Sequence, residues 1–136
     1  MSAERDARAW LVELLATDPT LAANAPAGVY FGVAPPQTPH PNIVVTATDA
    51  QHTRTADRQK AMTSGTWRIV VWSAEDTPTA AVAAAVERIE ELLDRTTDTH
   101  NGTTISVVAE SSHTHTAVSD GDLFHAEGGW FRFWAH

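Results

Sequence analysis

The sequence predicts an α+β fold, in which a mainly antiparallel sheet of four to five strands carries two helices packed on one face. Two segments place their apolar residues at helical spacing, which predicts the helices. The strand-like segments are joined by short or hairpin-like stretches, which favours antiparallel pairing. A length of 136 residues with 43% hydrophobic and 19% charged residues is typical of one globular domain, expected to cover residues 1–136.

The first element is a helix over residues 3–16. The pair Asp18-Pro19 ends it, because the residue before a proline avoids helical geometry. The same pair can start one more helical turn through Leu21, with Asp18 as N-cap and Pro19 at the first position. The apolar stripe of the first helix contains Ala3, Ala7, Trp10, Leu11 and Leu14.

The next segments read as strands separated by loops. Residues 28–33 predict a short strand, and the four prolines in residues 34–41 predict an extended loop. Residues 42–48 are rich in β-branched side chains and predict a second strand. Residues 49–62 are polar, and we expect a mobile loop or a protruding hairpin tip there. The strongest strand spans residues 63–73.

Alternation divides the side chains of this strong strand between two faces of the sheet. Trp67, Ile69 and Val71 share one face. Arg68, Val70 and Trp72 share the other.

The second helix is predicted to begin with Thr77 as N-cap and Pro78 at the first position, and to end near Thr96. Residues 100–102 predict a turn and residues 103–110 a strand. A polar loop is expected over residues 111–125, with its tip at residues 119–122. The stripe of the helix contains Val82, Val86, Ile89 and Leu93.

The final strand is predicted over residues 127–135. Phe131 and Phe133 alternate there with Trp130, Arg132 and Trp134. The aromatic side chains therefore fall on both faces of the sheet.

Charge and composition restrict the partners. The net charge is −8, from 17 acidic and 9 basic residues, whereas a DNA-binding protein normally carries the opposite balance. Sequence-specific DNA binding is therefore not expected, although a negative surface would suit a channel through which DNA slides as passing cargo. The chain has no cysteine, its first residues lack the apolar run of a signal peptide, and no stretch is long and apolar enough to predict a membrane span. We expect folding in the cytosol and no membrane partner.

No catalytic motif is recognisable, and the sequence predicts neither an enzyme nor a cofactor. It contains no nucleophile elbow and no glycine-rich phosphate loop. His113 and His115 alternate near His125, a pattern that could hold a metal ion. The spacing matches no metal-site signature, so a solvated polar loop is the preferred interpretation and no metal is predicted.

The tryptophans suggest an interaction surface. Trp10 and Trp67 are expected in the core. The opposite sheet face would be left partly bare by two helices, and large exposed apolar patches usually mark partner surfaces. Alternatively, the proline-rich loop folds back and covers them. The predicted subunit interface contains Val70, Trp72, Trp130, Trp134, Arg54 and Arg58.

The order of these elements resembles that of the tail-completion proteins, or tail terminators, of long-tailed bacteriophages and phage-like gene transfer particles. The resemblance spans nearly the whole chain and rests on the order and punctuation of its elements. The matching segments are Asp-Pro-Thr-Leu-Ala at 18–22, Gly-Val-Tyr at 28–30, the proline-rich loop, Pro-Asn-Ile-Val-Val at 41–45, the strand 67–73, the alanine-rich helix 79–93 and the aromatic strand 130–134.

The resemblance implies a structural virion protein that forms a ring, commonly a hexamer, on the last ring of a tail tube. Such a ring ends polymerisation and joins the head connector. The implied partners are further copies of the chain, the tail-tube protein and the head–tail connector. The implied location is the virion tail, after assembly in the host cytoplasm. Ring closure needs two different complementary patches, for which the tryptophan-bearing face and residues 49–62 are the candidates.

Three other interpretations remain open from the sequence. One is another head–tail connector or minor tail protein. A second is a metal-binding α+β domain that uses His113, His115 and His125. The third is a small-ligand-binding dimer, in which the aromatic face lines a pocket.

Overall fold

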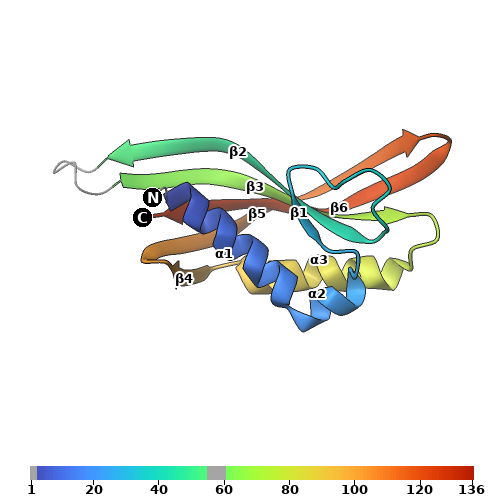
Figure 1. Ribbon diagram of the computed structural model, residues 1–136, viewed down its shortest axis with the longest axis horizontal. Helices are drawn as coiled ribbons and strands as arrows, with labels where there is room; N and C mark the ends of the chain where they lie inside the picture. The colour runs from blue at the N-terminus through green and yellow to red at the C-terminus, as the bar shows by residue number, and fades with distance from the viewer. Residues whose placement is uncertain (1–2, 55–60) are drawn as a thin grey trace.

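The computed structural model of the protein describes residues 3–54 and 61–136, with segments 49–54 and 61 described by their backbone alone. Figure 1 shows an elongated sheet with helices beneath it. The elements in chain order are α1 (Ala3–Thr17), α2 (Pro19–Asn24), β1 (Val29–Phe31), β2 (Asn42–Arg54), β3 (Ala61–Ala74), α3 (Thr79–Leu93), β4 (Thr96–His100), β5 (Thr103–Ser119) and β6 (Asp122–Ala135).

Within the described residues the sheet has six strands, in the order β1-β2-β3-β6-β5-β4. The prediction of a mainly antiparallel sheet is confirmed, since only β1 and β2 pair in parallel. The predicted four to five strands were too few. Strand β4 went unrecognised because its sequence, Thr-Thr-Asp-Thr-His, contains no apolar residue that could alternate.

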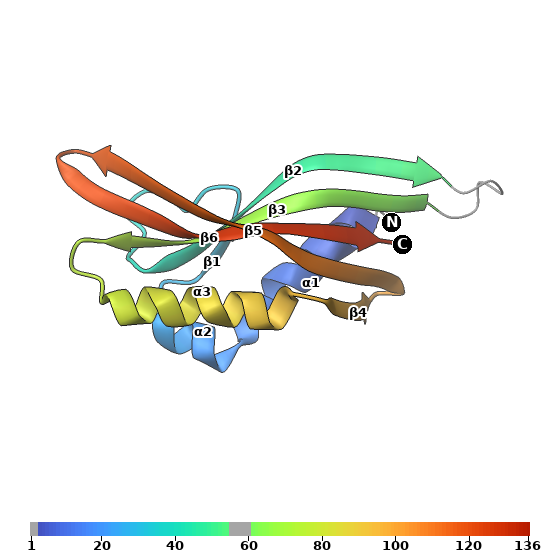
Figure 2. The ribbon, with the colours of Figure 1, turned by 180° about the vertical axis from the view of Figure 1, so that it is seen from behind.

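The described helices all lie on one side of the sheet, as Figures 1 and 2 show from opposite directions. Trp10 and Trp67 are buried between the two layers, as predicted. Trp67 stacks on Phe133 with ring centroids 4.0 Å apart. None of the described helices is long and apolar enough to cross a membrane. The core also contains Ala7, Leu11, Leu15, Leu21, Ile43, Val45, Ile69, Val71, Val82, Ile89, Ile105 and Phe131.

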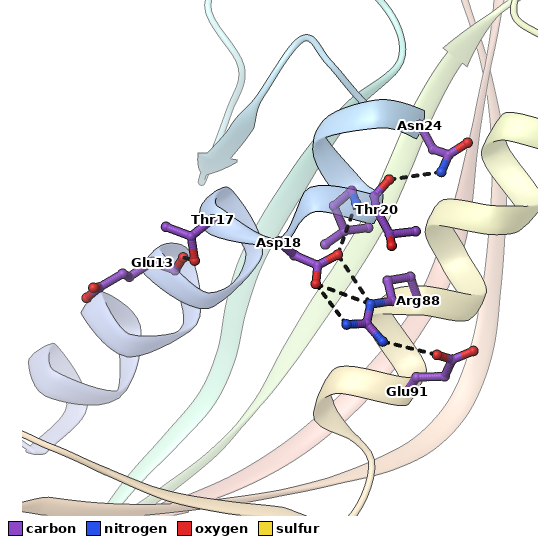
Figure 3. A network of polar contacts seen from close by, with 8 residues as sticks. Glu13, Thr17, Asp18, Thr20, Asn24, Arg88 and Glu91 are labelled. Carbon is purple, nitrogen blue, oxygen red and sulfur yellow. Dashed lines mark hydrogen bonds and ion pairs between the residues drawn. The ribbon is translucent and has the colours of Figure 1, made fainter.

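The junction between α1 and α2 is tied to α3 by a buried carboxylate, drawn in Figure 3. The Asp18 side chain accepts a hydrogen bond from the backbone N–H of Leu21 at 3.0 Å, which confirms its predicted capping role. Arg88 in α3 donates from Nε and Nη2 to the same carboxylate at 2.9–3.2 Å. This guanidinium lowers the pKa of Asp18 below its usual value.

The start of α3 differs from the prediction. The helix begins at Thr79 after Pro78, and Pro78 supplies no side-chain cap. The hydroxyl of Thr77 accepts instead from the backbone N–H of Ala74 at 3.1 Å, so it stabilises the preceding turn. Sequence could not separate these two roles, because threonine favours helix caps and turns alike.

Two hairpins extend past the helical layer at opposite ends of the sheet (Figure 1). Strands β2 and β3 continue their pairing as far as Arg54 opposite Ala61, which fits the expected hairpin rather than a loop beginning at residue 49. The polar loop predicted over residues 111–125 was wrong: these residues pair within the β5–β6 hairpin. Its turn, Asp120-Gly121, does lie inside the predicted tip.

Strand β6 passes very close to both of its neighbours at two consecutive glycines, to β3 at Gly128 and to β5 at Gly129. A Cβ added at Gly128 would lie 1.9 Å from the carbonyl oxygen of Ile69 and 2.8 Å from the Cα of Val70. A Cβ at Gly129 would lie 2.7 Å from the carbonyl oxygen of Ser111 in β5. The backbones of three adjacent strands therefore meet where no side chain fits.

Candidate subunit interface

The sheet face turned away from the helices, here called the open face, is organised in cross-strand rows. Residues directly opposite one another in paired strands point to the same face. The register aligns one row as Asn42, Trp72, Ala126 and His115, a second as Val44, Val70, Gly128 and His113, and a third as Thr46, Arg68, Trp130 and Ser111.

A bulge in β5 brings two histidines onto this face. Ser106 lies opposite Trp134 and Ser111 lies opposite Trp130, so Glu110 is an extra residue that shifts the alternation of β5 by one. Residues of odd number after the bulge therefore face away from the helices. His113 packs edge-on against Trp130 at a centroid distance of 5.7 Å.

The row that contains Trp72 also ends in a histidine whose ring contacts a tryptophan. The ring of His115 lies edge-on to Trp72, with the centroids 6.0 Å apart. At the far end of the face, the guanidinium of Arg132 lies 5.6 Å from the ring of Trp134. Aromatic and basic side chains thus alternate along the open face.

The three predicted interface tryptophans, Trp72, Trp130 and Trp134, all lie on the open face and are partly exposed. Val70 also lies on this face, but it is only 1% exposed and therefore offers no surface to a partner. Ala34 from the proline-rich loop and Trp72 pack against its cluster. The loop thus folds back over part of the face, and the tryptophans remain available.

Two of the predicted interface residues cannot be placed. Arg58 lies outside the described residues, and the side chain of Arg54 lies outside the described atoms. Both stay predictions.

Several polar atoms on the open face are buried without a partner. Nε of Arg68, Nε2 of His113 and Oδ1 of Asn42 are shielded from solvent, yet none has a hydrogen-bond partner within the described chain. A buried donor or acceptor left without a partner costs roughly 1–3 kcal/mol. Arg68 and His113 are each partly exposed as whole residues, so other atoms of these side chains stay accessible on the open face.

Sequence reasoning missed Arg68 and His113 as members of this site. The sequence predicts the correct face for Arg68 but no role. The alternation of side chains along a strand predicts which face each one points to, and it does not predict how deeply each is buried. His113 was assigned to a loop, since the bulge that turns it onto the sheet has no signature in the residues around Glu110.

The surroundings of the His113 ring favour its neutral form. Burial lowers the pKa of His113 below its usual value, and the positive charges of Arg68 and His115 lower it further. A neutral imidazole can donate from one ring nitrogen and accept at the other, which suits it to a polar contact across an interface.

The His113 pKa predicts a pH dependence of folding. Because the unfolded pKa exceeds the folded one, the unfolded chain binds more protons between the two values, and stability falls as the pH falls through that window below about 6.5. His113→Gln should flatten the slope of unfolding free energy against pH by at most about 1.4 kcal/mol per pH unit. Urea unfolding at pH 7.5 to 5 measures this slope, with His125→Gln as control. An unchanged slope in His113→Gln would contradict the assignment.

The three histidines proposed as a metal site are not brought together. His113 and His115 face away from the helices, whereas His125 pairs with Thr116 on the other face, its Nδ1 3.2 Å from the Thr116 hydroxyl. Among the described residues no three His, Asp or Glu side chains are grouped closely enough to hold a metal ion. The geometry therefore gives no support to the His-based metal interpretation.

A groove of about 550 Å³ lies between the proline-rich loop and the tip of the β5–β6 hairpin. Asn42, Arg68 and Trp72 contribute to its lining, so the groove is continuous with the open face. His40 stacks on Phe124 across it, with centroids 5.0 Å apart. The small-ligand interpretation thus draws on the same surface as the subunit interface.

The structure is thus a helix-backed sheet whose open face carries aromatic and basic side chains. Comparison with known protein families gives one match. Residues 9–135 match the family described as tail completion protein gp17, and the chain belongs to this family of phage tail proteins. It is accordingly a structural component of a virion or phage-like particle, as the resemblance in its sequence implied.

Solved structures share the fold. A chain from the virion of a native gene transfer agent particle superposes with a TM-score of 0.69 and 16% identity, covering 99% of this chain and 98% of that one. A second structure, whose description names no function, gives a TM-score of 0.60 at 12% identity, with 100% and 96% of the two chains covered. Comparison with curated protein sequences finds no match.

Proposed function

We propose that the protein is a tail terminator: a ring of identical copies that caps the end of a tail tube, stops its polymerisation and presents a surface to the head connector. The observation that carries this proposal is the open face, whose partly exposed tryptophans lie beside buried polar atoms without partners. Membership of the tail completion family supports a place in a phage tail. Assembly takes place in the host cytoplasm, and DNA crosses the ring only as cargo.

Ring closure requires heterologous contacts, in which two different patches of one subunit meet their complements on two neighbours. The open face and the helix-covered face lie on opposite sides of the sheet (Figure 2), which suits a subunit that is contacted from two sides. The paired ends of β2 and β3, residues 49–54 and 61–62, lie at one end of the sheet and offer a further surface. These surfaces support a ring, commonly a hexamer in this class of protein.

The proposal predicts that Trp72→Asp and Trp134→Asp abolish ring formation and tube capping while leaving the chain folded. A carboxylate at either position would be desolvated against apolar surface in the assembly but would remain in water in the free subunit. Val118→Asp is the control, because Val118 is 70% exposed and lies on the other face of the β5–β6 hairpin. Circular dichroism checks folding, and light scattering checks assembly.

The deciding experiment is negative-stain electron microscopy of the purified protein at high concentration, with and without purified tail tubes. Rings, or caps on tube ends, in the wild type and their loss in the two tryptophan variants are the expected results. A wild-type protein that ignores tube ends under every condition would overturn the terminator role in favour of a head–tail connector or minor tail protein. Tryptophan variants that cap tubes normally would remove the open face from the assembly.

A further inference from the structure

The middle of the open face, here called the basic centre, carries the positive charge of Arg68, although the chain has a net charge of −8. Arg68 lies beside Trp130 in its row, and His113 and His115 lie in the two adjacent rows. Among the described residues no ion pair joins Arg68 to an acidic side chain, and the residue is partly exposed. Its guanidinium is therefore open to an acceptor group, and a carboxylate is the acceptor that matches a guanidinium best.

The complementary charge lies on the opposite side of the same molecule. Val82, Ala85, Ile89 and Leu93 of α3 are buried against the sheet, which turns Glu87 and Glu91 outward. Glu90 lies on the flank of the helix, where it lines a groove shared with β5. Glu87, Glu90 and Glu91 are all exposed. Glu91 already pairs with Arg88 at 3.2 Å, whereas neither Glu87 nor Glu90 joins an ion pair within the described residues.

The outward surface of α3 is also shaped for close approach. Ala80 and Ala83, which precede these glutamates, are exposed and present only methyl groups. Small side chains let a helix lie near the flat rings of Trp72 and Trp130 while its carboxylates reach the basic centre. The helix has 15 residues, so it is about 22 Å long and can cross several strands.

We propose that the open face of one copy binds the outward surface of α3 on the next copy, with Glu87 and Glu90 meeting Arg68 and His113. This inference rests on the proposed ring and names its contact. The acidic surface of α3, rather than the predicted patch at residues 49–62, is the counterpart of the open face. The two surfaces lie on opposite sides of the molecule, so the contact is heterologous and repeats from copy to copy.

Other acids of the open side fix the register of this contact. Glu110 pairs with Arg132 at 3.6 Å on one side of the basic centre. Asp120 and Asp122 lie at the tip of the β5–β6 hairpin on the other side. A helix shifted toward either end would bring its glutamates against like charges, which disfavours the shifted positions.

Charge reversal tests the contact. Arg68→Glu places an acid in the open face, and the double variant Glu87→Arg/Glu90→Arg places bases on α3. Each variant alone should raise the concentration needed to cap half of the tube ends by about tenfold or more, because like charges then face each other. A mixture of equal amounts should restore capping, since each altered surface then meets its complement on the other variant. The chain that carries all three changes should also assemble.

The possible results distinguish a wrong contact between copies from a wrong assignment of the terminator role. Wild-type capping together with normal capping by both reversed variants, or a mixture that assembles no better than its components, overturns the contact and leaves the terminator role intact. A wild type that does not cap tubes overturns the terminator role itself. If Arg68→Glu fails to fold, Arg68→Gln replaces it and should weaken capping, and unaltered capping by Arg68→Gln counts against the contact.

Discussion

Gly128→Ala is expected to destabilise the fold by more than about 3 kcal/mol, and Gly128→Val to prevent folding at ordinary temperatures. The added Cβ would fall 1.9 Å from the carbonyl oxygen of Ile69, and the atoms in its way belong to the backbone. A backbone atom cannot turn aside as a flexible side chain can, so β3 and β6 must separate. Separation would break the pairing at the centre of the sheet.

Urea unfolding of Gly128→Ala measures this loss. Ser112→Ala is a matched control, because Ser112 is exposed in the neighbouring strand β5, opposite Gly129. Its substitution should change the unfolding free energy by less than about 0.5 kcal/mol. Equal midpoints for the two variants would show that the strands can part at no cost, contrary to the close approach.

Asp18→Ala is expected to cost about 2 to 3 kcal/mol. The substitution removes the N-cap of α2, which contributes roughly 1 kcal/mol, and it removes the buried partner of Arg88. The ion pair is discounted because the Arg88 side chain is 33% exposed and keeps Glu91 as a second partner (Figure 3). Glu91→Ala, which removes only that exposed partner, should cost less than about 0.5 kcal/mol.

The Asp18 carboxyl also predicts an acid response. Its folded pKa lies below the unfolded value, so its contribution to stability is complete above about pH 4 and is lost as the pH falls through the folded pKa. The stability difference between wild type and Asp18→Ala should therefore shrink on acidification. Parallel stability curves from pH 7 to pH 2.5 would contradict the assigned ion pair.

Sequence periodicity predicted the parts of the fold that pack against something apolar. Trp67 and Ile69 alternate with Arg68 because one face of β3 contacts the helices, and the structure places them accordingly. The same reasoning failed for residues 111–119 of β5, which are mostly polar and exposed on both faces. A strand without a buried side chain on either face leaves no alternation to detect.

The candidate site was predictable only in part, for a related reason. The positions of Trp130 and Trp134 follow from alternation with Phe131 and Phe133. The rings of His113 and His115 reach the open face because a bulge inserts Glu110, and a one-residue shift reverses every side chain after it. Such a shift follows from the pairing of distant strands, and local sequence does not encode it.

The bulge at Glu110 also protects the subunit against unwanted association. Strand β4 pairs with residues 103–107 of β5, so from residue 108 onward β5 forms the border of the sheet. A long regular border would expose unpaired N–H and C=O groups to any passing strand. An extra charged residue interrupts that row and twists the border, which disfavours its pairing with another chain. The bulge is therefore expected to disfavour edge-to-edge pairing between copies of the chain.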